Sequence, residues 1–146
     1  MIKKAYLILF WLCASILACA QQPDLVFHHI TEKDGLSFNI INCFLHDSHG
    51  NLWIGTYNGL NCFDGSHFYV YKKGSNKNTL PDNTVHKLTE DKKGNIWGGT
   101  DNGIFCFNKQ TNSFKTYTTP NVKVWFAVSS ILCDQQGTIW AGNVYC

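Results

Sequence analysis

Side chains that could do chemistry recur at fixed places in this sequence. Asp47, Asp91 and Asp134 each open an Asp-x-x-Gly segment that leads to a tryptophan. A pair of carboxylates can cleave a glycosidic bond, one as acid and the other as base or nucleophile. An aspartate that returns at one place in every repeat is better explained as a turn former, because its carboxylate accepts the N–H groups of the turn. We therefore predict no catalytic residue among them.

The six histidines show no metal-binding spacing. His46 and His49 lie on either side of a predicted turn, and no Cys-x-x-Cys pair accompanies them. The sequence also contains no arginine, so an enzyme site would lack one of the usual groups for binding or stabilising charge. We predict neither a metal nor a cofactor.

Three aromatic residues, Phe38, Trp125 and Phe126, could stack on the rings of an oligosaccharide, since aromatic faces offer apolar area with weak directional preference. They lie in a loop whose sequence differs between repeat units. A residue that varies between units is a better candidate for function than one that is the same in every unit. The competing role is aromatic packing between neighbouring sheets. We predict a ligand site at these three residues.

A repeat of about 44 residues places these side chains. The stretch "DSHGNLWIGTYNGL", Asp47–Leu60, returns as "DKKGNIWGGTDNGI", Asp91–Ile104, and a partial copy, "DQQGTIWAGN", begins at Asp134. Self-similarity at a fixed period of about 20 to 50 residues is typical of solenoids, propellers and arrays. The residues that define the repeat, which we expect to be structural, are Asp47, Gly50, Trp53, Asp91, Gly94, Trp97, Asp134, Gly137 and Trp140.

Each unit reads as four short strands joined by tight turns. Asp-x-x-Gly suits a turn whose glycine has positive φ, and Asn58-Gly59 suits a two-residue hairpin with positive φ at both positions. A four-stranded antiparallel sheet of about 40 to 50 residues is the blade of a β-propeller. We therefore predict an all-β chain, a partial propeller of about three four-stranded blades. In the first unit we expect strands at Ile40–Leu45, Leu52–Thr56 and Leu60–Phe63 and through Phe68 and Tyr71.

About three units are too few to close a ring, because the smallest propellers have about four blades. A segment near 26–31 resembles the outer strand of a blade and would complete the last one. We expect an incomplete propeller at 21–146, with repeat units at about 36–79, 80–122 and 123–146. The missing blades would come from a longer parent protein or from other copies of the chain.

The N-terminus reads as an export signal. Two lysines precede an apolar run, Ala5–Leu17, and Ala18-Cys19-Ala20 fits an A-x-A cleavage site. We predict a signal peptide at 1–20 and a periplasmic mature chain. Lipid anchoring through Cys19 is the less favoured alternative, because "ILAC" resembles a lipobox only in part.

The composition argues against a nucleic-acid partner, and the positions of the cysteines argue against disulfides. A net charge of +2, with aromatic residues at 14%, is an ordinary globular balance without a basic stripe, so we predict no nucleic-acid partner. Export permits disulfides, but Cys62 and Cys106 hold one repeat position and would lie too far apart to bond. We expect buried free thiols.

The repeat, with its Leu-x-x-Asn lead and its Asp-x-x-Gly-Asn-(Leu/Ile)-Trp-x-Gly-Thr-x-Asn-Gly body, resembles the two-component regulator propeller repeat. The opening stretch, Phe27–Gly65, is similar to the start of the periplasmic sensor of hybrid two-component systems typical of Bacteroidetes. The resemblance implies large periplasmic propellers that feed a membrane span and a histidine kinase, with many members sensing glycans. None of these downstream parts is in the sequence, so we predict no enzyme activity for the chain itself.

The predicted function is that of an N-terminal fragment of a periplasmic ligand-sensing propeller in a hybrid two-component signalling protein, with an oligosaccharide as its ligand. Two alternatives remain open. One is a fragment of an exported propeller enzyme that acts on polysaccharide. The other is a truncated product without function, because unpaired sheet edges favour aggregation.

Overall fold

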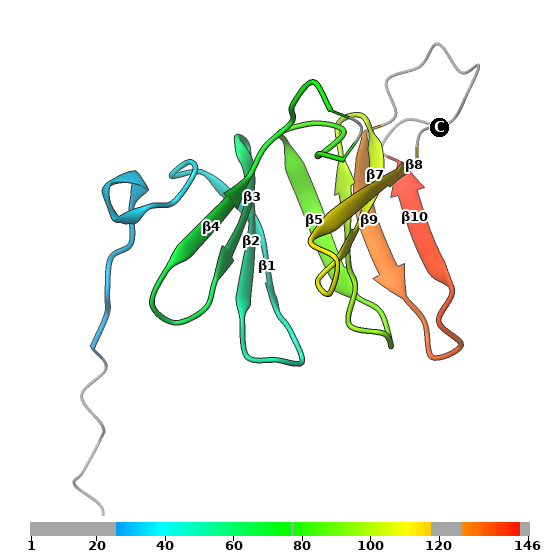
Figure 1. Cartoon of the computed structure of the whole chain (residues 1–146), viewed down its shortest axis with the longest axis horizontal. Coiled ribbons are helices and arrows are strands. Elements are labelled where there is room, and N and C mark those ends of the chain that lie inside the picture. The colour runs from blue at the N-terminus through cyan, green and yellow to red at the C-terminus, as the bar shows by residue number, and fades with distance from the viewer. Residues whose placement is uncertain (1–25, 77, 118–126, 144–146) are drawn as a thin grey trace, which may run out of the picture.

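The computed structural model describes residues 26–76, 78–117 and 127–143, and these form three antiparallel sheets in chain order (Figure 1). Sheet 1 has the strand order β1-β2-β3-β4, sheet 2 has β5-β6-β7-β8, and sheet 3 pairs β9 with β10. The strands are β1 (Ile41–His46), β2 (Leu52–Thr56), β3 (Gly59–Phe63), β4 (Phe68–Tyr71), β5 (Val85–Glu90), β6 (Ile96–Thr100), β7 (Gly103–Asn108), β8 (Ser113–Tyr117), β9 (Val128–Cys133) and β10 (Ile139–Asn143).

The predicted all-β, partial-propeller fold is confirmed. Sheet 1 packs on sheet 2 and sheet 2 on sheet 3, with β1, β5 and β9 adjacent, and the described sheets form an open row with sheets 1 and 3 at its ends (Figure 1). The third repeat unit, which is a partial copy in the sequence, forms two strands among the described residues. Within the described residues, no helix is long and apolar enough to cross a membrane. The predicted signal peptide at 1–20 lies outside the described residues.

The Asp-x-x-Gly turns form by the mechanism that the sequence indicates. Asp47 Oδ1 accepts the backbone N–H groups of His49 and Asn51 at 2.9 Å each. The three turn glycines, at 50, 94 and 137, have φ of 89°, 78° and 87°, a region that residues with a Cβ rarely adopt. Each turn therefore delivers the following strand, and its tryptophan, in the same orientation.

The Asn-Gly hairpins differ from the prediction by one residue. Thr56 pairs with Gly59, so the two turn residues are Tyr57 and Asn58 rather than Asn58 and Gly59. Asn58 does not have positive φ, and the Asn58 N–H donates instead to Thr56 Oγ1 at 3.0 Å. Gly59 has φ of 134°, as predicted, and a Cβ there would also lie 2.8 Å from the Tyr71 carbonyl oxygen.

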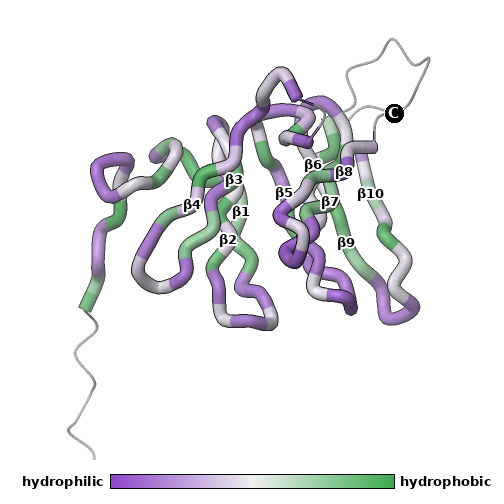
Figure 2. Tube along the Cα trace, in the orientation of Figure 1, coloured by the Kyte–Doolittle hydropathy of each residue, from purple (hydrophilic) through white to green (hydrophobic). Residues whose placement is uncertain are grey.

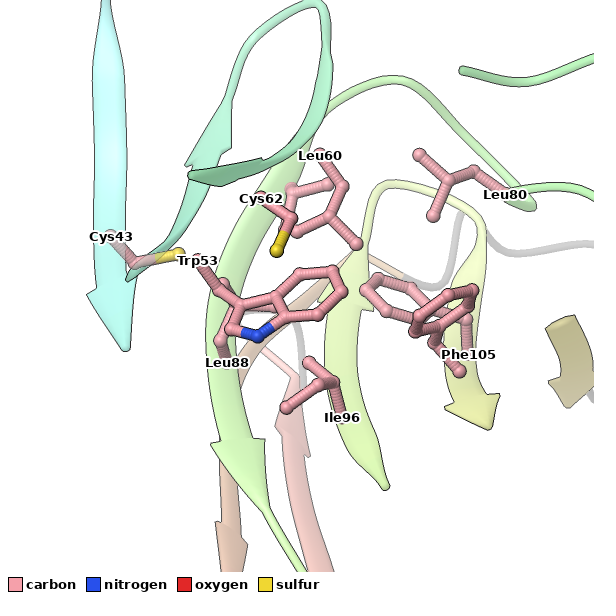
Figure 3. Packing of buried hydrophobic residues seen from close by; sticks show 10 residues of the cluster. Cys43, Trp53, Leu60, Cys62, Leu80, Leu88, Ile96 and Phe105 are labelled. Atoms are coloured by element: carbon pink, nitrogen blue, oxygen red, sulfur yellow. The ribbon is translucent and has the colours of Figure 1, made fainter. Parts of the chain in front are cut away.

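The main core lies between sheets 1 and 2 (Figure 3). Trp53 of sheet 1 contacts Phe107 of sheet 2, with ring centroids 5.4 Å apart. Each buried aliphatic or aromatic side chain adds about 1.5–3 kcal/mol of hydrophobic stabilisation. Hydrophilic residues concentrate in the turns at the lower edge, and apolar residues follow the strands (Figure 2). The core consists of Cys43, Trp53, Leu60, Cys62, Leu80, Val85, Leu88, Ile96, Phe105 and Phe107.

The segment before β1 covers part of the other face of sheet 1. The short 3-10 helix η1 (Glu32–Asp34) is capped by Thr31, and the Ser37 N–H donates to the buried Asn61 Oδ1 at 2.8 Å. No strand forms at residues 26–31, and the blade that such a strand would complete is not among the described sheets. Its ring-closing role stays a prediction, as do the domain bounds.

One repeat position is glycine in all three units, at Gly55, Gly99 and Gly142. Among the described residues, a following sheet lies over Gly55 and Gly99 but not over Gly142. A Cβ at Gly99 would lie 2.4 Å from the Val128 carbonyl oxygen of sheet 3, whereas at Gly142 the nearest atom is 3.6 Å away. We expect Gly99→Ala to lower the free energy of unfolding by about 1–3 kcal/mol. Gly142→Ala should change it by less than about 0.5 kcal/mol. Urea unfolding of both variants tests this, and equal effects would contradict it.

Candidate functional site

The repeat-defining aspartates and tryptophans bind each other. In all three sheets the tryptophan Nε1 donates to Oδ2 of the aspartate six residues earlier at 2.8 Å. The side chains nevertheless differ in burial: Trp53 is 2% exposed, Trp97 is half-buried and Trp140 is 62% exposed. The hydrogen bond orients each indole within its own sheet, and for Trp53 the packing of Phe107 from sheet 2 adds to its burial.

An ion-pair cluster ties sheet 1 to sheet 2 beside Trp53. The Lys109 ammonium, from the turn after β7, donates to Asp47 Oδ2 at 3.0 Å and to Glu90 Oε1 at 2.8 Å. Glu90 in turn accepts both the N–H and the hydroxyl of Ser48 at 2.8 Å. We call Asp47, Ser48, Glu90 and Lys109 the seam cluster.

The seam cluster fixes the charge of its carboxylates. Burial acts to raise the pKa of Asp47, but hydrogen bonds from Trp53, Asn51 and Lys109 outweigh it and hold that pKa well below its usual range. The pKa of Glu90 is lowered in the same way, because its bonds to Lys109 and Ser48 outweigh its burial. Both groups are therefore anions at neutral pH.

A metal ion has no vacant place in this cluster. Asp47, His49 and Glu90 bring one ligand atom each to within 4.8 Å of one another, a spacing that could hold a cation. The Lys109 ammonium already contacts these groups, at 3.2 Å from His49 Nδ1. Lysine here fills the role that a cation would have.

A shallow hollow of about 340 Å³ opens beside the seam cluster, between sheets 1 and 2. Its floor is Trp53, Cys62 and Phe107, and β4 supplies Tyr69 and Tyr71 as its wall. Tyr69 and Tyr71 share one face because side chains two apart on a strand point the same way. We call this site the seam hollow; Asn51, Lys109 and Asn112 form its rim.

A second polar group lies at the other end of sheet 2. His86 Nε2 is 2.6 Å from Asp101 Oδ1, with the side chains 27% and 41% exposed. His86 is the extra residue of a β-bulge in β5, and bulges re-aim side chains. An imidazole held by a carboxylate can bind a polar ligand or act as a general base. Among the described residues, no further side chain is hydrogen-bonded to this pair.

The predicted ligand residues are only partly placed by the structure. Phe38 is half-buried in the segment before β1, and Trp125 and Phe126 lie outside the described residues. Sequence reasoning missed His86, Asp101 and Tyr69. Their signal was a break in the repeat, because the matching residues are Asn42, Tyr57 and Lys115.

Comparisons with known proteins agree with this geometry. Residues 35–58 and 79–102 match the family model described as two component regulator propeller. Histidine kinase P4 of Formosa agariphila is 40% identical over 60 residues, which are 41% of this chain and 4% of that protein. The chain thus spans only a small part of that relative.

Solved structures share the fold. The extracellular domain of BT3049 from B. thetaiotaomicron, assigned as a hybrid two component system, matches with a TM-score of 0.68 and 29% identity over 82% of this chain and 16% of that chain. Virginiamycin B lyase from Staphylococcus aureus matches with a TM-score of 0.57 and 24% identity, over 70% of this chain and 34% of its own, which shows the fold alone. Two stretches of the chain thus carry the two component regulator propeller repeat, and the fold resembles that of the BT3049 extracellular domain.

Proposed function

We propose that the chain is part of an exported, ligand-sensing propeller of a hybrid two-component signalling protein, and that its ligand is an oligosaccharide. The observation that carries the proposal is the match of 82% of the chain to the extracellular domain of BT3049. The likeness to a histidine kinase over 60 residues supports the same assignment. In such a protein the propeller would bind ligand, and the remaining parts would carry the signal.

The way that a propeller passes on a binding event follows from its construction. Ligand can shift an equilibrium only by binding one arrangement better than another. Sheets 1 and 2 are joined by packed side chains and by the seam cluster, so a ligand that contacts both would favour one relative placement of the two sheets. Phe38, Trp125 and Phe126 are the proposed contacts for the oligosaccharide in the loops before the inner strands. Further blades, from a parent protein or from other copies, would complete the ring.

The alternative is an exported propeller enzyme that acts on polysaccharide. The His86–Asp101 pair favours it, since a carboxylate-held imidazole is a common general base. An enzyme would also need an acid, a nucleophile or a second carboxylate within reach of the same bond. The sensor therefore remains the better proposal.

The test is calorimetric titration of the full chain with a panel of neutral oligosaccharides. We expect binding, with affinity at least about tenfold weaker in Trp125→Ala, as expected when a stacked ring is lost. Tyr117→Ala, which removes an exposed ring of β8, should bind as the parent does. Absence of binding across the panel would overturn the proposal. Cleavage of an oligosaccharide that stops in Asp101→Asn would replace it with the enzyme.

A further inference from the structure

We propose that the seam hollow is a second binding site, which takes the ring of a neutral sugar. It lies between two sheets that each have four strands; its floor and wall come from β2, β3, β4 and β7, and its rim comes from the turn before β2 and the turn after β7. Phe38, Trp125 and Phe126, the residues of the proposed function, are not among its lining residues. A volume of about 340 Å³ suits one or two sugar rings.

The apolar side of the hollow is a set of rings at staggered angles. Tyr71 stacks on Trp53 with ring centroids 6.1 Å apart and meets Phe107 at 4.9 Å. Tyr69 is 51% exposed, so its ring remains open to a ligand. A sugar ring has one face of C–H groups, which packs on such rings, and aromatic stacking supplies apolar contact without fixing a direction.

The polar side of the hollow has free hydrogen-bonding groups. Within the described residues, the Asn112 amide and the Tyr71 hydroxyl have no partner, and Asn51 uses its amide N–H groups on Asp47 but leaves Oδ1 free. These groups can donate to and accept from hydroxyls. An amide, a hydroxyl and a carbonyl oxygen around an aromatic floor match a ring with hydroxyls on its edge.

Charge excludes an anionic ligand. The three rim and cluster charges are one cation, Lys109, and two anions, Asp47 and Glu90, so their sum is negative. Lys109 is held by both carboxylates and is not free to pair with a ligand. The charge of Asp64 raises the pKa of Tyr69, and burial raises the pKa of Tyr71, so both hydroxyls stay neutral. A neutral ligand fits these surroundings best.

The tyrosine lining of the hollow belongs to the first seam because the repeat breaks there; the hollow beside Trp97 at the second seam is lined by Asp91, Lys92, Lys93, Gln136 and Gly137. Across sheet 1, Trp53 pairs with Cys62 and Cys62 with Tyr69. In sheet 2 the equivalent pairs are Trp97 with Cys106 and Cys106 with Lys115, so Lys115 takes the place of Tyr69. The Lys115 ammonium lies 5.0 Å from the centroid of the Tyr117 ring. A lysine on its own aromatic neighbour offers no open ring face. The tyrosine at this position is therefore the residue that makes the site.

The experiment is a titration of the full, isotopically labelled chain with glucose, galactose, xylose and cellobiose, followed by NMR. We expect the Trp53 indole N–H and the Asn112 side-chain amide to shift, while the Trp140 indole N–H stays in place. Tyr69→Ala should weaken this binding at least about tenfold. The matched control is Lys115→Ala, at the same register position of sheet 2, which should leave it unchanged.

A second variant guards against loss of structure. Asn112 has φ of 48°, so Asn112→Gly removes the amide while keeping a backbone that glycine adopts readily. We expect it to weaken binding with an unchanged melting temperature. Shifts caused by phenol or indole but by no sugar, or tighter binding of glucuronate than of glucose, would overturn the proposal.

The two proposals fail in different ways. If Trp125→Ala abolishes sugar binding and Tyr69→Ala does not, the seam site is wrong and the loop site stands. If Tyr69→Ala abolishes the Trp53 and Asn112 shifts and Trp125→Ala leaves them, the seam site stands whatever the loop binds. If no sugar shifts either reporter in the parent chain, the seam site is wrong.

Discussion

Trp53→Ala is expected to lower the free energy of unfolding by about 3–5 kcal/mol, whereas Trp140→Ala should change it by less than about 1 kcal/mol. The two tryptophans hold one repeat position and make the same 2.8 Å hydrogen bond to an aspartate. They differ in what lies over them. Trp53 is 2% exposed against Phe107 and Tyr71, and Trp140 is 62% exposed. The difference in free energy therefore measures the packing over the indole, by Phe107 of the next sheet and by Tyr71 of the same sheet.

Trp97 supplies the intermediate point of the series. It is half-buried and stacks on Tyr117 with ring centroids 5.5 Å apart. We expect Trp97→Ala to cost less than Trp53→Ala and more than Trp140→Ala. Urea unfolding of the three variants, followed by circular dichroism, gives the order. Equal losses would mean that the hydrogen bond to aspartate, and not the following sheet, carries the stability of each unit.

This graded burial marks the limit of what the sequence could predict. A repeat position is local information, and it placed Trp53, Trp97 and Trp140 on equivalent strands. Burial depends on the neighbouring sheet, which the repeat does not specify for its last unit. The strand at Leu52–Thr56 was predicted with its observed bounds because a glycine turn and a tryptophan define it. The hairpin after it shifted by one residue because Thr56 Oγ1 binds the Asn58 N–H.

The site was harder to predict because its residues meet across sheets. Lys109 reaches Asp47 over 62 positions of sequence, and no local pattern indicates such a contact. His86 points to Asp101 because of a bulge, and a bulge breaks the alternation that sequence patterns detect. Tyr69 was visible as a break in the repeat, but its significance depends on the hollow that sheet 2 closes. The residues of the proposed sites thus lie where the repeat breaks rather than where it is kept.

Lys109→Met is expected to lower the free energy of unfolding by about 3 kcal/mol at pH 7, since it removes one partner of a buried ion pair and leaves the other charged. Asp47 is 2% exposed and would keep its bonds to Trp53 and Asn51 but lose its cation. Lys115→Met, an exposed lysine of β8, should cost less than about 1 kcal/mol. Similar losses in both variants would show that Lys109 acts only as a surface charge.

The pH dependence separates an ion pair from lost packing. The folded pKa values of Asp47 and Glu90 are depressed, so their contribution is full above their unfolded pKa values, near 3.9 and 4.3, and is lost as pH falls below them. The folded pKa of Lys109 is raised: burial acts to lower it, but bonds to Glu90 and Asp47 outweigh burial. Its contribution is therefore full below about pH 10 and lost as pH rises further.

The cost of Lys109→Met should thus be constant between about pH 5 and 9 and should shrink at about pH 3.5. A cost that is the same at pH 7 and pH 3.5 would assign the effect to the lysine methylenes that line the seam hollow. In a double-mutant cycle with Asp47→Asn, a coupling energy near zero would lead to the same conclusion.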